Sequence, residues 1–286
     1  AQNNAADEFG FASGVRTITG YQSLLDDPEI DAVYIPLPHT LHVEWSIKAL
    51  AAGKHVLCEK PMAMHASDYK AILSAQEKSE KHVAEAYMIS HHPQWARVRD
   101  LIADGTIGTV QQISAAFTYD NSKDPENIRN DKSRGGGALP DIGVYAMGAA
   151  MMVMDAPLTD ISSRIRYENG YDIYAHVTGH VGGAQYAGYV SMRMHLYQAF
   201  EIHGNRGVIR LTAPFNSGVY GEARIEIYQP DSELRVERFP AFNQYVAQVE
   251  AFQNTALTGA PYPWTIPMAQ RTQAALDEIY AKAIVL

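Results

Sequence analysis

The chain has 286 residues, of which 47% are hydrophobic and 19% are charged, and its formal net charge at pH 7 is −9. A chain of this length and composition is expected to fold into two globular domains with a substantial core. The negative charge argues against a nucleic-acid partner, because binding to a phosphate backbone requires clustered lysine and arginine residues.

The single cysteine, Cys58, excludes an intrachain disulfide framework and is typical of a reducing compartment. The longest apolar stretch, Gly143 to Met154, is too short to cross a bilayer. The first ten residues have neither the basic start nor the apolar centre of a signal peptide. We therefore expect a cytoplasmic protein without a membrane partner, although a leader removed upstream of residue 1 would be compatible with the same sequence.

The first hundred residues alternate between strand and helix patterns. Ala32 to Ile35 is a short apolar run ended by prolines, Leu41 to Ala52 is an amphipathic helical pattern closed by a glycine, and His55 to Cys58 is a second apolar run. This order predicts one crossover unit of a parallel sheet. The other expected elements are helices at Asn4 to Phe9, Tyr21 to Leu25, Asp68 to Lys81 and Pro93 to Ala103, and a strand at Val83 to Met88.

After Gly108 the sequence becomes a series of short segments rich in β-branched and aromatic residues, which is typical of antiparallel sheet. The expected strands are Val110 to Tyr119, Ile161 to Tyr167, Ala175 to Val181, Tyr186 to Met194, Phe200 to His203, Val208 to Leu211 and Ala223 to Tyr228. The expected helices are Pro140 to Met154, Tyr245 to Leu257 and Met268 to Ala283. The fold class is therefore α/β, with a Rossmann-like parallel domain (1–108) followed by an α+β domain (109–286) whose sheet is large, open and mainly antiparallel.

Ligands of open parallel sheets bind beyond the carboxyl ends of the strands. In this chain Pro36, Pro38 and His39 follow the first of these strands, and Glu59 and Lys60 end the second. Lys60 is the first candidate for chemistry, because a lysine is a compact charge whose pKa shifts readily when it is desolvated. A solvated lysine paired with Glu59 is the simpler alternative.

The second candidate pair lies after the run of three glycines that begins at Gly135. Asp141 and Tyr145 are four residues apart, so a helix beginning near Pro140 places them on one face close to its N-terminal end. A capped helix with Tyr145 in the core explains the same residues, because the helix dipole by itself favours a carboxylate there. The residues alone leave both interpretations open.

The histidines do not form a familiar metal-binding pattern. His39 with His42, His91 with His92, and His176 with His180 have no carboxylate or cysteine at a recognised ligand spacing. We expect no metal site, and we expect His39 and His42 to line the crevice at the strand ends. The loop with Asn216, Tyr220 and Glu222 is polar and aromatic, and either lies at the surface or covers a site.

Nearly the whole chain resembles the Gfo/Idh/MocA family, which includes glucose–fructose oxidoreductase and inositol dehydrogenase. The resemblance rests on PEIDAVYIPLPHTLH, AGKHVLCEKPMA, EAYMISHHPQW, LIADGTIGTV, NIRNDKSRGGGALPDIGVY and FEIHGNRGVIRL. It implies an N-terminal dinucleotide-binding domain, a C-terminal domain with a large open sheet, and hydride transfer between NAD or NADP and a sugar, inositol or related polyol.

The resemblance also implies roles for individual residues. Lys60, Asp141 and Tyr145 are the expected catalytic residues, and with Tyr87 they are the expected substrate contacts. Lys60 would lower the pKa of Tyr145 and favour the phenolate as proton acceptor, while Asp141 orients the sugar or the lysine. The residues expected to contact the cofactor are Pro36, Pro38, His39, His42, Glu59 and Lys60.

One departure from the family concerns the cofactor. The glycine-rich turn that holds the pyrophosphate does not follow any strand that can be assigned, since Gly10, Gly14 and Gly20 have the wrong spacing. Either the chain is truncated, or the protein has lost or altered cofactor binding. The alternative function is accordingly a non-catalytic sugar-binding or regulatory protein. Because a large uncovered sheet face is a liability in a monomer, we expect a homodimer or a higher homo-oligomer.

Overall fold

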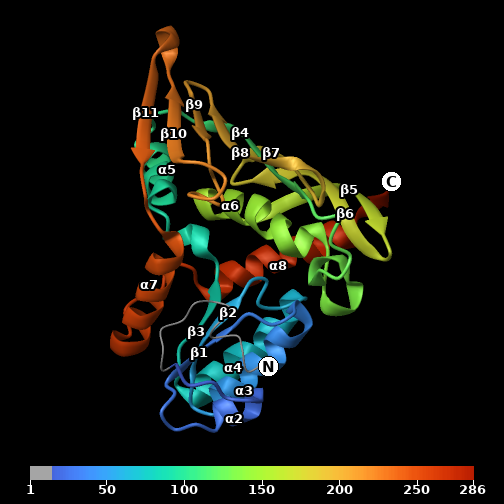
Figure 1. Cartoon of the computed structure of the whole chain (residues 1–286). Helices are drawn as coiled ribbons and strands as arrows, with labels where there is room; N and C mark the ends of the chain where they lie inside the picture. The colour runs from blue at the N-terminus through green and yellow to red at the C-terminus, as the bar shows by residue number, and fades with distance from the viewer. Residues whose placement is uncertain (1–14) are drawn as a thin grey trace.

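The computed structural model describes residues 15–286 and shows two sheets joined by helices (Figure 1). The helix expected from Asn4 to Phe9 lies outside the described residues. The first sheet has three strands in the order β1-β2-β3, and the second has nine in the order β11-β10-β9-β8-β4-β7-β6-β5-β12. The predicted fold class, a Rossmann-like parallel sheet followed by a larger and mainly antiparallel one, is confirmed.

The small sheet is built from the predicted crossover unit. Strands β1 (Ala32–Ile35), β2 (His55–Glu59) and β3 (Val83–Ala86) are parallel and in sequential order. Three helices accompany them, namely α2 (Tyr21–Leu25), α3 (His42–Ala51) and α4 (Tyr69–Ser79). Within residues 15–286, β1 pairs only with β2, so its other edge has no neighbouring strand.

The large sheet contains more strands than the sequence pattern predicted. Its members are β4 (Val110–Asp120), β5 (Leu158–Glu168), β6 (Tyr171–Val181), β7 (Ala184–Ser191), β8 (Arg193–Gly204), β9 (Val208–Leu211), β10 (Ala223–Tyr228), β11 (Leu234–Phe239) and β12 (Ala283–Val285). The β4–β7 and β5–β12 pairs are parallel and the others antiparallel. The edge strands β11 and β12 were not predicted, and the last helix ends at Ala281, two residues before its expected end.

Three helices cover one face of the large sheet, as Figure 1 shows. They are α5 (Pro93–Ala103), α6 (Val144–Met154) and α8 (Ile266–Ala281). Helix α6 is buried on every side from Val144 to Val153, because it lies between the sheet and α8. The helical stretch 132–154 is long and apolar enough to cross a membrane by composition, but 94% of its most apolar window is buried inside the protein, as in a core helix.

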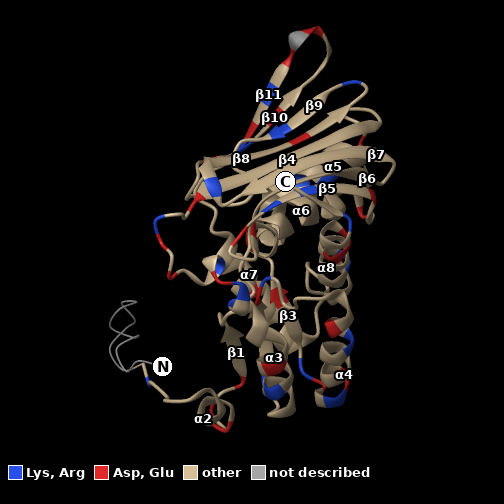
Figure 2. Ribbon diagram, turned by 90° about the vertical axis from the view of Figure 1, so that its right-hand side faces the viewer, with Lys and Arg blue, Asp and Glu red and all other residues tan. Residues whose placement is uncertain are grey.

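The two sheets share their helices. Trp95 of α5 packs edge-on against Phe200 of the large sheet at a ring-centroid distance of 5.0 Å. Helix α8 contacts both β3 and α6, and it lies between the large sheet and helix α4 (Figure 2). Residues of α7 (Gln244–Thr258) and of β1 line one groove. The domain boundary near residue 108 stays a prediction, and the aromatic packing places α5 with the second domain.

Candidate active site

A cavity of about 430 Å³ lies where the carboxyl end of β2 meets α6 and the large sheet. Its walls come from both domains. Glu59 and Lys60 extend from the small sheet, while Tyr119, Arg129, Asp141 and Tyr145 extend from the second domain. Lys60, Asp141 and Tyr145, the candidates from the sequence, therefore line one cavity.

Lys60 is held against Asp141 by two contacts. Its Nζ donates to the backbone oxygen of Asp141 at 2.5 Å and to the Oδ1 atom of that residue at 3.1 Å. Both side chains are less than a tenth exposed. Lys60 is therefore a buried, paired ammonium group, and the solvated lysine considered as the alternative is excluded.

Two further groups complete the shell around Asp141. Arg129 lies with its Nε 2.9 Å from Oδ1, and the Tyr119 hydroxyl donates to Oδ2 at 2.6 Å. Burial alone raises the pKa of the Asp141 carboxyl, but the charges of Lys60 and Arg129 and the bond from Tyr119 outweigh it and hold the pKa well below its usual range. Asp141 is therefore ionised at neutral pH.

Tyr145 lies directly beside this cluster. The Lys60 Nζ is 4.8 Å from the centre of its ring, and its hydroxyl points to the Sδ of Met88 at 3.2 Å. Burial, followed by the negative charge of Glu59, raises the pKa of Tyr145 well above its ordinary value. The expected phenolate is therefore wrong for this structure, because desolvation outweighs the neighbouring lysine and keeps the phenol neutral.

Asp141 and Tyr145 are positioned by an irregular turn at the beginning of helix α6. Leu139–Gly143 forms one π-helical turn, a geometry frequent at functional sites, before α6 begins. A Cβ at Gly136 would lie 2.4 Å from the backbone oxygen of Arg129, and one at Gly137 would lie 2.2 Å from the Oδ1 of Asp172. The glycines are therefore required by the close approach of these two neighbours.

Asp172, and not Asp141, is the carboxylate that binds the N-terminal end of this helical stretch. Its Oδ2 accepts the Leu139 N–H at 2.7 Å, and its Oδ1 accepts the Tyr280 hydroxyl at 2.6 Å. Asp141 is therefore free of a capping role, and its side chain is directed to the cations of the cavity. Asp172 was missed in the sequence because its partner lies 33 residues away.

The other five predicted residues lie outside the cavity lining, namely Pro36, Pro38, His39, His42 and Tyr87. Tyr87 is fully buried behind Tyr145, with a ring-centroid distance of 5.4 Å, and its hydroxyl donates to the Val144 oxygen. The ring nitrogens of His42 bond the backbone oxygens of Pro61 and Leu37, which ties together the loops after β1 and β2. His39 bonds the Gly135 oxygen at 2.8 Å and so holds the glycine-rich turn.

The strongest missed residues are Arg129 and Tyr119, which contact Asp141, and Asn127, which lines the same cavity. Asn216 lines it too. Asn216 comes from the polar loop for which the sequence left a surface or a site position open. The glycine-rich turn could have drawn attention to Arg129, because Gly136 packs against the arginine's own backbone.

Comparison with known proteins places these features in a family. Residues 1–87 match the model of an oxidoreductase family with an NAD-binding Rossmann fold, and residues 95–210 match the GFO/IDH/MocA C-terminal domain. The chain belongs to the Gfo/Idh/MocA oxidoreductase family. The resemblance predicted from the sequence motifs is confirmed.

Relatives within the Gfo/Idh/MocA family cover nearly the whole chain. An uncharacterised oxidoreductase of Rhizobium meliloti is 38% identical over 98% of this chain and 84% of its own length. The dTDP-3,4-didehydro-2,6-dideoxy-alpha-D-glucose 3-reductase of Streptomyces violaceoruber is 35% identical, covering 87% of this chain and 72% of that protein.

A solved structure agrees with these sequence relatives. The 3-ketoreductase KijD10 of Actinomadura kijaniata, crystallised with NADP and TDP-benzene, superposes with a TM-score of 0.89 at 28% identity, covering 98% of this chain and 87% of that one. These findings confirm the NAD(P)-dependent oxidoreductase class and favour it over the non-catalytic alternative.

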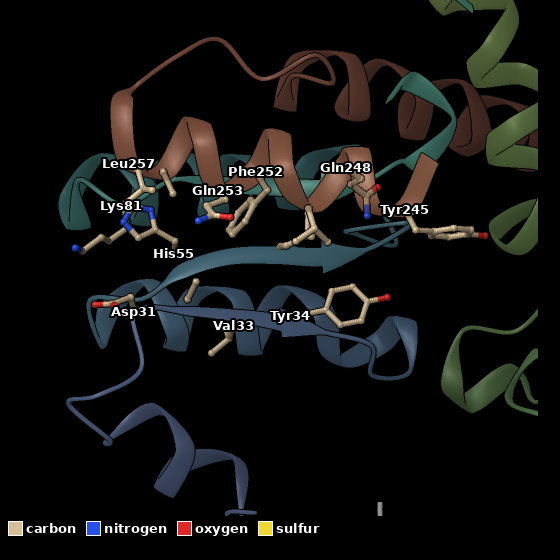
Figure 3. Close-up of a pocket in the computed structure, with 14 residues that line it drawn as sticks. Asp31, Val33, Tyr34, His55, Lys81, Tyr245, Gln248, Phe252, Gln253 and Leu257 are labelled. Carbon is tan, nitrogen blue, oxygen red and sulfur yellow. The ribbon is translucent and has the colours of Figure 1, made fainter. Parts of the chain in front are cut away.

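A larger cavity of about 800 Å³ lies between the unpaired edge of β1 and helix α7 (Figure 3). Val33 and Tyr34 line one side, and Phe252 and Leu257 line the other. Tyr245 borders both this groove and the smaller cavity. The groove is mainly apolar and contains neither Lys60 nor Tyr145, so the chemistry is assigned to the smaller cavity.

The described residues fit only part of a dinucleotide. The strand ends carrying Pro36 to His39 and Glu59 to Pro61 lie at the edge of the sheet where such cofactors bind. Between residues 15 and 286, no glycine-rich turn links a strand of the small sheet to a following helix. Over the same range, no group of three His, Cys, Asp or Glu side chains is arranged to hold a metal ion.

The burial of Asp172 predicts a pH dependence of stability. Desolvation raises the pKa of its carboxyl from an ordinary 3.8 to about 6 in the folded protein, despite the bonds from Tyr280 and Leu139. The folded state therefore binds a proton more tightly than the unfolded state, and this contribution is fully present below pH 4 and lost as the pH rises through 6. Over that window it amounts to roughly 3 kcal/mol.

The control is Asp172→Asn, whose amide can accept from Leu139 and donate to Tyr280 without titrating. Urea unfolding of both proteins between pH 4 and 8 should show the wild type losing stability relative to the variant as the pH rises. A stability difference that stays constant over this range would contradict the assignment.

Proposed function

We propose that this protein transfers hydride between NAD or NADP and a carbon of a sugar or related polyol held in the cavity lined by Lys60, Asp141 and Tyr145. The observation that carries the proposal is the convergence of a buried ammonium and a neutral phenol, 4.8 Å apart from Nζ to ring centre, on one polar cavity. The sugar 3-reductase activity of the relatives supports the same substrate class.

The protonation states of Lys60 and Tyr145 favour reduction of a ketone group over oxidation of an alcohol. As hydride reaches the carbonyl carbon, the carbonyl oxygen gains charge and must receive a proton. The neutral Tyr145 hydroxyl can donate this proton, and the Lys60 ammonium can stabilise the developing oxyanion. In the reverse direction, the same tyrosine would first have to be deprotonated against the effect of burial.

Asp141 acts in this scheme through Lys60. Its ionised carboxylate pairs with the ammonium at 3.1 Å and fixes the position of Nζ. Removing the carboxylate would leave Lys60 and Arg129 without their buried counter-charge, which is strongly destabilising. Arg129, Asn127 and Asn216 supply further polar groups for sugar hydroxyls.

The cofactor, when bound, supplies or accepts the hydride through its nicotinamide ring. Pro36, Pro38, His39, Glu59 and Lys60 are the residues that we propose to contact it, since they follow the carboxyl ends of β1 and β2. We propose His42 for the same group, because its bonds to the backbone oxygens of Leu37 and Pro61 hold the loops after β1 and β2 together.

Two substitutions test the catalytic roles. Lys60→Ala removes the oxyanion partner and Tyr145→Phe removes the proton donor, so each should lower kcat by roughly 10²- to 10⁴-fold. The measurement is the rate of NADPH or NADH oxidation with keto-sugars, and circular dichroism establishes that each variant is folded. Lys48→Ala and Tyr228→Phe are the matched controls, because both side chains are exposed and neither residue lines the cavity. Near-normal turnover in both site variants would contradict the roles.

The alternative, a sugar-binding protein without catalysis, is distinguished by calorimetry. Titration with NAD⁺, NADP⁺ and their reduced forms should release or absorb heat if the protein is an oxidoreductase. A protein that binds a sugar and none of the four nucleotides would have the alternative function. We also propose a cytoplasmic location, because the one cysteine, Cys58, is a buried free thiol.

We propose in addition that the protein is a homodimer or a higher homo-oligomer. Helices cover one face of the large sheet, and the opposite face carries small and aromatic side chains, among them Ala187, Tyr189, Tyr197 and Ala199. Such a face is suited to packing against a second copy.

Sedimentation equilibrium should therefore give a multiple of the chain mass for the wild type. Ala187→Glu together with Ala199→Glu should shift the protein towards the monomer, because the substitutions place charges in the packed face. A wild-type monomer at micromolar concentration would contradict the proposal.

A further inference from the structure

A buried carboxylate outside the cavity connects the segments that carry Lys60 and Tyr145. Glu85 belongs to β3, is 4% exposed and does not line the cavity. Its Oε2 accepts the Met62 N–H at 2.8 Å and the Tyr69 hydroxyl at 3.1 Å, and its Oε1 accepts the Trp264 Nε1–H at 2.9 Å. One side chain therefore joins the loop after β2, helix α4 and the link between α7 and α8.

The first connection leads to Lys60. Met62 is two residues after the lysine, and its N–H is bound by a carboxylate rather than by a strand neighbour. Strand β3 pairs with β2 so that Glu85 lies opposite Cys58, just before the loop begins. The Glu85 side chain thus reaches forward along the sheet and fixes the backbone from which Lys60 enters the cavity.

The second connection leads to Tyr145 through two stacked rings. Trp264 is 1% exposed and stacks on Tyr87 with ring centroids 4.0 Å apart, and Tyr87 stacks in turn on Tyr145 at 5.4 Å. The bond from Nε1 to Glu85 fixes the orientation of the indole. The orientation of this indole then fixes the Tyr87 ring, which stacks on the buried side of Tyr145.

The donors explain why an acid occupies this position. Two N–H groups, from Met62 and Trp264, are directed at different oxygen atoms of the carboxylate. A glutamine has only one acceptor oxygen, so its amide group would face one of these N–H donors and leave it buried without a partner. The carboxyl group of Glu85 therefore offers a separate oxygen to each N–H donor, which the amide of glutamine cannot do.

We propose that Glu85 is a positioning residue that fixes the location of Lys60 relative to Tyr145. It acts on Lys60 through Met62, and on Tyr145 through Trp264 and Tyr87. This inference rests on the proposed function of Lys60 and Tyr145. It assigns a role in turnover to a group that contacts neither the cavity nor the reacting atoms.

The kinetic test compares three variants of the full chain. Glu85→Gln disturbs both connections, Trp264→Phe removes only the Nε1–H while keeping an aromatic ring, and Tyr69→Phe removes a bond to Glu85 that leads to neither reacting residue. Because a misplacement of about 1 Å costs roughly 10²-fold in rate, Glu85→Gln should lower kcat by roughly 10- to 100-fold with little change in KM. Trp264→Phe should lower kcat less, and Tyr69→Phe should leave it within about twofold of the wild type. Equal effects of all three on unfolding temperature, with kcat unchanged, would overturn the proposal.

A structural test separates this proposal from the proposed function. In a crystal structure of Glu85→Gln, the contact of Lys60 Nζ with Asp141 Oδ1 (3.1 Å) and the spacing of the Tyr87 and Tyr145 rings (5.4 Å) should change by about 0.5 Å or more. Unchanged geometry would overturn the positioning role, whatever the activity. If Glu85→Gln does not fold, the same measurement on Trp264→Phe decides, with a shift of the Tyr87 and Tyr145 rings supporting the proposal and no shift overturning it. A wild type that reduces no sugar would refute the proposed function alone.

Discussion

The ion cluster around Asp141 is the interaction on which the rest of the site depends. A buried carboxylate without partners is costly, and this one is balanced by an ammonium from the small domain and a guanidinium from the large one. Tyr119 satisfies its second oxygen. Because Lys60 follows β2 of the small sheet and Arg129 lies in the segment between β4 and α6, the cluster also fixes how these two parts of the chain meet at the cavity.

The same cluster explains the chemical character of its neighbour. Tyr145 lies beside a cation, yet that cation is already paired with Asp141, and the surrounding core withholds the water that would stabilise a phenolate. The result is a neutral proton donor next to a positively charged hydrogen-bond donor, which matches the needs of a carbonyl oxygen receiving hydride. Protonation state and packing thus support the proposed reduction of a ketone group.

Much of this arrangement could be predicted from local sequence. Apolar periodicity and glycine positions predict the strand, helix and strand around Lys60. They also predict the helix that carries Asp141 and Tyr145. The prediction that these residues line one cavity rested on the family resemblance. Strand β11 was missed because its residues are mostly exposed and its apolar–polar alternation covers only Leu234 to Glu237, and β12 because it has only three residues.

The residues that were not predicted depend on contacts between distant segments. Arg129 lies in a polar stretch with Lys123, Lys132 and Arg134, and nothing in the local sequence distinguishes the one cation that turns towards Asp141. Tyr119 and Asp172 both lie in strands, and their hydrogen-bond partners Asp141 and Leu139 are 22 and 33 residues away in the sequence. The raised pKa of Tyr145 follows from burial, which a sequence reports only as a tendency.

The most direct test of the central claim is a double-mutant cycle between the two domains. Free energies of unfolding would be measured in urea at pH 7 for the wild type, Lys60→Met, Asp141→Asn and the double variant. If the buried pair joins the domains, the two single changes should be non-additive, with a coupling on the order of 2 kcal/mol. Additivity within about 0.5 kcal/mol would show that the two side chains do not depend on each other, and would contradict the account of the site given above.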